Sequence, residues 1–75
     1  MTTVDLNIAK ILDNLTEGYN VTLTREDGYK YILGMKYKNG EEVYTYQFGR
    51  IKREFTTFDA MLRKLEKFEF TNIEY

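Results

Sequence analysis

The sequence predicts a single α+β domain, in which a helix, a three-stranded antiparallel meander and a second helix follow one another within 75 residues. Apolar residues recur at helical spacing near both ends, and in the middle they alternate with polar residues between two glycine turns. Each helix has one apolar stripe and the sheet has one apolar face. We therefore expect a two-layer sandwich with both helices on one face. A chain of this length holds one core, so residues 1–75 are treated as one domain.

The first segment predicts an amphipathic helix that ends near Gly18. Thr2, Thr3 or Asp5 can cap its start, and glycine is common just past the end of a helix. Its apolar residues recur at intervals of three and four, as expected for a stripe that packs on a sheet: Val4, Ile8, Ile11, Leu12 and Leu15.

The first hairpin is predicted to turn through Glu26, Asp27 and Gly28. A two-residue Asp-Gly loop would place Tyr31 and Leu33 on the opposite side of the sheet from the apolar residues of the first strand. A three-residue loop with Gly28 in the left-handed conformation puts the large apolar residues on one face. We therefore favour the register that pairs Tyr19 with Met35, Val21 with Leu33 and Leu23 with Tyr31.

The second hairpin turns at Asn39-Gly40, which is typical of a two-residue type I′ loop because both of its central residues need positive φ. Closing the hairpin there extends the same apolar face without conflict. The two turns, chosen independently, thus agree on one sheet. The predicted pairs are Lys38 with Glu41, Met35 with Tyr44, Leu33 with Tyr46 and Tyr31 with Phe48.

A link from Gly49 to Phe55 is predicted to join the sheet to the second helix, which Thr56 or Thr57 can cap. Residues 70–75 alternate in polarity and are compatible with a short C-terminal strand. The apolar stripe of the second helix is Phe58, Met61, Leu62, Leu65 and Phe68.

The amino-acid composition limits the catalytic and metal-binding chemistry that the chain can perform. The chain has neither cysteine nor histidine, which excludes disulfides, the usual zinc ligands and a histidine-activated nucleophile. It also has no glycine-rich phosphate loop. We therefore expect a protein that is not an enzyme and that uses no cofactor and no metal. The sequence shows neither a signal peptide nor an apolar run of membrane-spanning length, so we expect a cytoplasmic protein without membrane contact.

The sheet face opposite the predicted core is the first candidate binding surface. One interpretation is an ordinary solvated face, because antiparallel sheets commonly leave one side wet. The other is a binding platform with two apolar contacts in a polar, mildly basic frame. The candidate residues there are Thr22, Thr24, Lys30, Ile32, Lys36, Val43 and Gln47. Four tyrosines (Tyr19, Tyr31, Tyr44 and Tyr46) fall on the core side, whereas Tyr29, Tyr37 and Tyr75 are better placed for outside contacts.

The second candidate surface is a compact basic cluster formed by Arg50, Lys52 and Arg53. These residues lie just before the predicted second helix, whose N-terminus would also favour anions. The cluster belongs to a basic middle segment, because residues 28–53 hold six lysines and arginines against two glutamates. The alternatives are a solvated linker and a contact with phosphates or an acidic partner.

The order of elements resembles the double-stranded RNA-binding domain. That family uses the loop between its first two strands and basic residues at the start of its second helix. The corresponding segments here are the loop Arg25–Gly28 and the helix start Thr56–Asp59. The resemblance implies a small nucleic-acid-binding domain that uses the basic middle segment.

The chain is also similar to small phage and mobile-element proteins that inhibit host defence enzymes, anti-CRISPR proteins among them. The similarity covers the order of elements, the small size and the frequent use of Asn, Lys, Glu and Tyr. It implies a non-enzymatic module that inhibits a host protein by steric occlusion, which is the function we favour. Nucleic-acid binding is the alternative, and a homodimer is a further expectation because partner chains stabilise short sequences.

Overall fold

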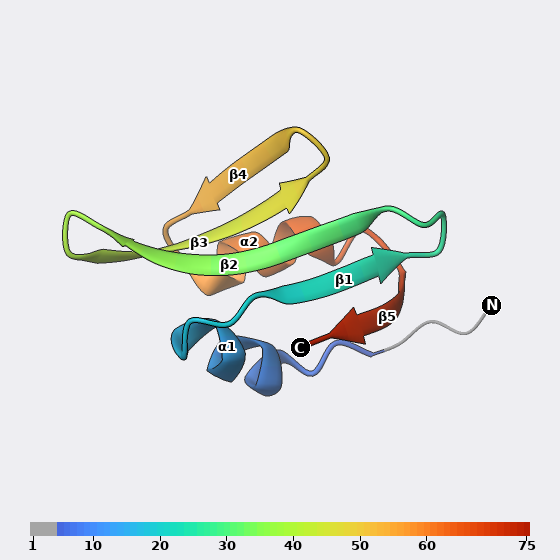
Figure 1. The fold of residues 1–75 in the computed structure, drawn as a ribbon, viewed down its shortest axis with the longest axis horizontal. Helices are drawn as coiled ribbons and strands as arrows, with labels where there is room; N and C mark the ends of the chain where they lie inside the picture. The colour runs from blue at the N-terminus through green and yellow to red at the C-terminus, as the bar shows by residue number, and fades with distance from the viewer. Residues whose placement is uncertain (1–4) are drawn as a thin grey trace.

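The computed structural model describes residues 5–75, which form two helices and one five-stranded antiparallel sheet (Figure 1). The sheet order is β4-β3-β2-β1-β5. The α+β class is confirmed, but the predicted three-stranded meander is only the centre of a wider sheet. The elements are α1 (Ile8–Thr16), β1 (Val21–Arg25), β2 (Lys30–Lys38), β3 (Glu41–Phe48), β4 (Ile51–Phe55), α2 (Phe58–Leu65) and β5 (Phe70–Glu74).

Both predicted hairpin turns are confirmed. Gly28 has a φ of 91° and donates its N–H to the Arg25 carbonyl at 3.0 Å, as a three-residue loop requires. Asn39 and Gly40 have φ values of 54° and 81°, which fit a type I′ turn. The resulting register agrees with the prediction at Val21–Leu33, Leu23–Tyr31, Lys38–Glu41, Met35–Tyr44, Leu33–Tyr46 and Tyr31–Phe48.

The predicted pairing of Tyr19 with Met35 is wrong, and so is the placement of Tyr19 in the core. The backbone of Tyr19 closes the end of α1 instead, by donating its N–H to the Asn14 carbonyl at 2.9 Å. Gly18, with a φ of 91°, donates to the Leu15 carbonyl, and the two bonds together form a Schellman motif. Strand β1 therefore begins only at Val21, and the Tyr19 side chain is 62% exposed.

The segment predicted as a link is strand β4. Phe48 and Ile51 lie opposite each other across a two-residue loop that begins with Gly49, whose φ of 58° suits the first position of a type II′ turn. Glycine followed by the alternation of Ile51 and Phe55 with charged residues is a hairpin signal. The charge of the segment obscured that signal in the sequence.

The C-terminal strand is confirmed as β5, which pairs with β1 rather than with a neighbour in the chain. The ladder is irregular between Thr24 and Arg25. Close to this point the Thr71 hydroxyl donates to the Thr24 carbonyl at 3.5 Å. The sheet thus has β4 at one margin and β5 at the other (Figure 1).

The two helices are shorter than predicted. The N-cap of α1 is Asn7, whose side chain accepts a hydrogen bond from the Lys10 N–H at 3.1 Å. The predicted cap Asp5 is therefore not the N-cap residue. Thr2, Thr3 and Val4 lie outside the described residues. Thr57 caps α2 as expected, by accepting from the Ala60 N–H at 3.2 Å. That helix ends at Leu65, so the predicted Phe68 lies beyond it.

Side chains from both helices join one hydrophobic core with alternate residues of the sheet. Its members are Ile11, Leu15, Val21, Leu23, Tyr31, Leu33, Tyr44, Met61, Leu65 and Phe70. The other face of the sheet therefore carries no part of this core. Within residues 5–75, neither helix has the length and apolar character needed to cross a membrane.

Candidate functional site

The candidate site is the sheet face that points away from the core, which we call the outer sheet face. The strand registers place on it every second residue of the five strands. These residues are Thr22, Thr24, Lys30, Ile32, Gly34, Lys36, Lys38, Glu41, Val43, Thr45, Gln47, Lys52, Glu54, Asn72 and Glu74. All seven outer-face candidates from the sequence lie on it.

The centre of the outer sheet face is a straight row across the strands. Each residue of the row lies opposite the next on the neighbouring strand. In order from β5 to β4 the row is Glu74, Thr22, Ile32, Gln47 and Lys52. Ile32 is 42% exposed although it is flanked by strands on both sides. It is therefore an apolar side chain held open to solvent in a polar row.

The predicted second apolar contact, Val43, is not available. On β2, Lys36 lies opposite Val43 of β3. On β4, Glu54 lies opposite Thr45, which is the next residue of β3 on the same face as Val43. The Lys36 ammonium nevertheless contacts the Glu54 carboxylate at 2.7 Å, so this ion pair spans β3. The valine below it keeps only 9% of its surface exposed. Lysine stems commonly cover apolar surface in this way.

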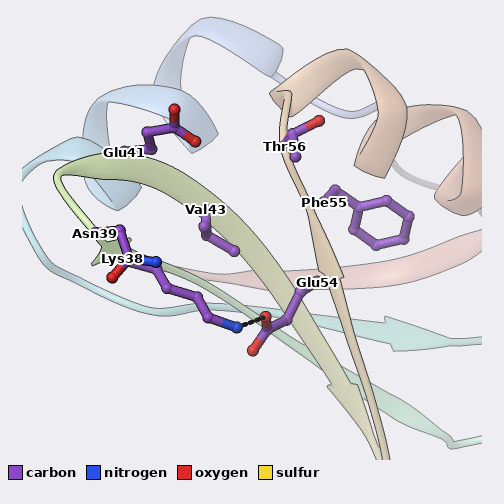
Figure 2. Close-up of a pocket in the computed structure, with 7 residues that line it drawn as sticks. All are labelled: Lys38, Asn39, Glu41, Val43, Glu54, Phe55 and Thr56. Carbon is purple, nitrogen blue, oxygen red and sulfur yellow. Dashed lines mark ion pairs between the residues drawn. The ribbon is translucent and has the colours of Figure 1, made fainter.

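A shallow hollow of about 230 Å³ lies beside this ion pair, between the end of the β2–β3 hairpin and the end of β4. Figure 2 shows the Lys38 side chain extending to Glu54, where the two charged groups are 3.6 Å apart, while Glu41 points away from them. Glu54 thus holds two lysines, and part of the positive charge of this face is neutralised. The lining residues are Lys38, Asn39, Glu41, Val43, Glu54, Phe55 and Thr56.

The predicted basic cluster is not brought together. Arg50 lies in the β3–β4 turn, Lys52 on the outer sheet face, and Arg53 on the core side opposite Tyr46. Successive residues of a strand point to opposite faces, which separates side chains that are adjacent in the sequence. The interpretation of these residues as a linker before a helix N-terminus is therefore wrong.

The tyrosines divide largely as expected. Tyr31 and Tyr44 are buried, and Tyr46 packs against the core. Tyr29, Tyr37 and Tyr75 are exposed, but two of them have contacts within the chain. The Tyr29 ring meets Phe48 edge-on at 5.1 Å, and the Lys10 ammonium lies 4.3 Å from the centre of the Tyr75 ring. Their exposure therefore does not by itself mark an interface.

Sequence reasoning missed five charged or polar members of the outer sheet face: Lys38, Glu41, Glu54, Asn72 and Glu74. Glu54, Asn72 and Glu74 lie on β4 and β5, the strands that were unassigned or weakly assigned. Lys38 follows Lys36 by two residues on the same strand, so alternation alone places it on this face. The ion pairs to Glu54 depend on β4 and had no signal in the sequence.

The Glu54 network predicts a pH-dependent contribution to stability. The hydrogen bond and charge of Lys36 lower the pKa of Glu54 below its ordinary value of 4.5. A lowered carboxyl pKa stabilises the fold above the unfolded value, and the effect is lost as pH falls through the folded value. Glu54→Gln is therefore expected to be less stable than the parent chain at neutral pH, with the difference vanishing in acid.

Urea unfolding from neutral to acidic pH measures this difference. Glu41→Gln is the matched control, because Glu41 lies on the same face and has no ion pair among residues 5–75. The Glu41 variant should lose less stability at neutral pH. A Glu54→Gln deficit that persists unchanged in acid would contradict the ion-pair interpretation.

The comparisons with known proteins give no match: no protein-family model, no curated protein and no solved structure matches the chain. The two resemblances drawn from the sequence stay predictions.

Proposed function

We propose that the chain is a non-enzymatic protein-binding module that binds its partner through the outer sheet face. The observation that supports this most directly is Ile32, which is 42% exposed in the middle of a row that crosses the whole sheet. Both helices pack on the opposite face of the sheet, where their side chains join the core. A hydrophobic side chain in a polar surround is the usual anatomy of a protein interface centre and rim.

The charges around Ile32 define the chemistry of the partner. Lys30 lies two residues before it on β2, and Lys52 ends the same row on β4. Among residues 5–75, neither lysine takes part in an ion pair. We therefore propose a partner protein surface with an apolar side chain that covers Ile32 and carboxylates that reach the two lysines. Binding of this kind would inhibit a larger host protein by covering its surface.

A nucleic-acid partner is less well supported. Lys36 and Lys38 are both held by Glu54, and Arg53 lies on the core side of the sheet. A phosphate backbone is recognised by several free cations on one surface. The outer sheet face offers two unpaired lysines within residues 5–75, beside Glu41 and Glu74. This mixed charge suits a protein surface better.

Affinity capture with face variants tests the proposal. The unmodified chain should capture a stoichiometric protein from a host lysate, and Ile32→Asp and Lys30→Glu should each abolish or strongly weaken its retention. The first variant places a charge at the apolar centre, and the second reverses the charge of a lysine beside it. Ile8→Asp is the matched control, since Ile8 is 39% exposed but lies on α1. Lys67→Glu controls for charge reversal away from the sheet.

Retention that is equal for the face variants and the controls would contradict this use of the outer sheet face. A heparin column separates the nucleic-acid alternative. Strong retention that is lost steeply with salt and reduced by Lys30→Glu would support nucleic-acid binding. Weak retention is expected for the protein-binding module.

A further inference from the structure

Among residues 5–75, no strand pairs with the outer edge of β4, and the backbone geometry of β4 shows which groups face outward. Phe48 and Ile51 close a two-residue loop and so form a hydrogen-bonded pair. Hydrogen-bonded and non-hydrogen-bonded pairs alternate along an antiparallel ladder, so the backbone N–H and C=O groups of Arg53 also bond to β3. Lys52 and Glu54 therefore present their N–H and C=O groups at the free edge.

The side chains of β4 are complementary under two-fold symmetry at every pair except the central one, where Arg53 faces Arg53 of the other copy. In an antiparallel pair centred on Arg53, Lys52 of one copy lies opposite Glu54 of the other, and Ile51 lies opposite Phe55. Ile51 is 45% exposed and would gain an apolar neighbour. The outward-facing backbone groups also match, because Lys52 and Glu54 then form hydrogen-bonded pairs.

We propose that the chain forms a two-fold symmetric homodimer by pairing β4 with β4 of a second copy, with Lys52 opposite Glu54. This register has two Lys52–Glu54 pairs against one pair of like charge, Arg53 with Arg53. Neighbouring registers are worse, since they lose both Lys52–Glu54 pairs and set Lys52 against Lys52 or Glu54 against Glu54. A self-complementary edge is what an isologous interface requires. This proposal does not rest on the proposed function, because it uses the backbone edge of β4. The two share Lys52, so in the dimer Lys30 is the lysine of the outer sheet face that stays free for another partner.

The other free edge is a poorer candidate. The ladder of β5 with β1 is irregular between Thr24 and Arg25, and irregularities of this kind interrupt edge pairing. The ladder of β4 with β3 is regular over all five of its pairs. The outer side chain of Glu54 already contacts Lys36 at 2.7 Å and Lys38 at 3.6 Å, so Lys52 of the second copy joins an existing network.

Sedimentation of the full chain from micromolar to millimolar concentration tests the dimer, with two charge variants as the key reagents. Lys52→Glu and Glu54→Lys should each weaken dimerisation by about tenfold, because symmetry introduces every like-charged pair twice. Mixing the two variants should restore association as a heterodimer, since each glutamate of one chain then faces a lysine of the other. Circular dichroism checks that both variants are folded.

Two further readouts distinguish β4 from any other dimer surface. The amides of Lys52 and Glu54 should exchange slowly with solvent only at concentrations where the dimer forms, whereas the Arg53 amide is protected throughout. Arg53→Thr should tighten the dimer, because it removes two arginines that face each other across the axis. A chain that stays monomeric at millimolar concentration, or a dimer indifferent to both charge variants, would overturn the proposal.

Discussion

Replacing Leu33 with alanine is expected to lower the free energy of unfolding by about 2–5 kcal/mol. Leu33 is fully buried at the centre of the sheet, between Val21 on β1 and Tyr46 on β3. Its removal leaves a cavity that two fixed strands cannot close. A domain of this size has a total stability of roughly 4–11 kcal/mol, so this one change removes much of it.

Urea unfolding of Leu33→Ala and of Ile32→Ala compares the stability lost at a core-facing and at an outward-facing residue of β2. Ile32 is the preceding residue on the same strand but points to the outer sheet face, so its truncation should change stability by less than about 1 kcal/mol. The two midpoints should therefore differ widely while the denaturant slopes stay alike. Equal losses for the two variants would mean that the two faces of β2 are assigned incorrectly.

Tyr31→Ala is expected to destabilise the domain by about 3–5 kcal/mol, as aromatic truncations in cores do. The Tyr31 ring stacks on Phe48 at 4.7 Å and meets Phe70 edge-on at 5.8 Å, with 4% of the residue exposed. One side chain therefore joins β2 to β3 and β5. Its loss should loosen both halves of the sheet, which thermal and urea unfolding would both detect.

Tyr31→Phe separates the ring from the hydroxyl group. The Tyr31 hydroxyl accepts a hydrogen bond from Arg25 Nη1 at 3.2 Å, and Arg25 is also held by Asp27 at 2.8 Å. The conservative variant keeps the packing and removes only that hydrogen bond, so a loss of about 1 kcal/mol is expected. If it were as damaging as alanine, the hydroxyl and not the ring would be the dominant contribution.

The hairpins could be predicted from sequence because their turns restrict the backbone locally. Gly28 and the Asn39-Gly40 pair need positive φ, and each turn left one register that gathered the apolar residues. Tyr19 could not be placed in this way. Alternation extends through it, but the helix end uses its backbone N–H, and a helix cap competes with a strand for the same residue.

The candidate site was predictable where it depended on alternation and not where it depended on distant strands. Lys30 and Ile32 follow from the register of β2 alone. The ion pairs of Glu54 do not, because Glu54 reaches the outer sheet face only through the pairing of β4 with β3. A run of charged residues between Gly49 and Phe55 resembles a solvated linker in composition, and a charged edge strand has the same composition.

The position of β5 has a consequence for the order of folding. The other three ladders join strands that are consecutive in the chain, whereas the Thr71–Thr24 hydrogen bond closes a separation of 47 residues. Closing so long a loop costs more conformational entropy than closing a hairpin. During synthesis, β1 to β4 can thus assemble first, with one edge of β1 bare until Phe70–Glu74 has emerged from the ribosome. In that interval the bare edge of β1 can pair with another nascent chain, as the edge of β4 can, and the pairing of β5 with β1 then covers it.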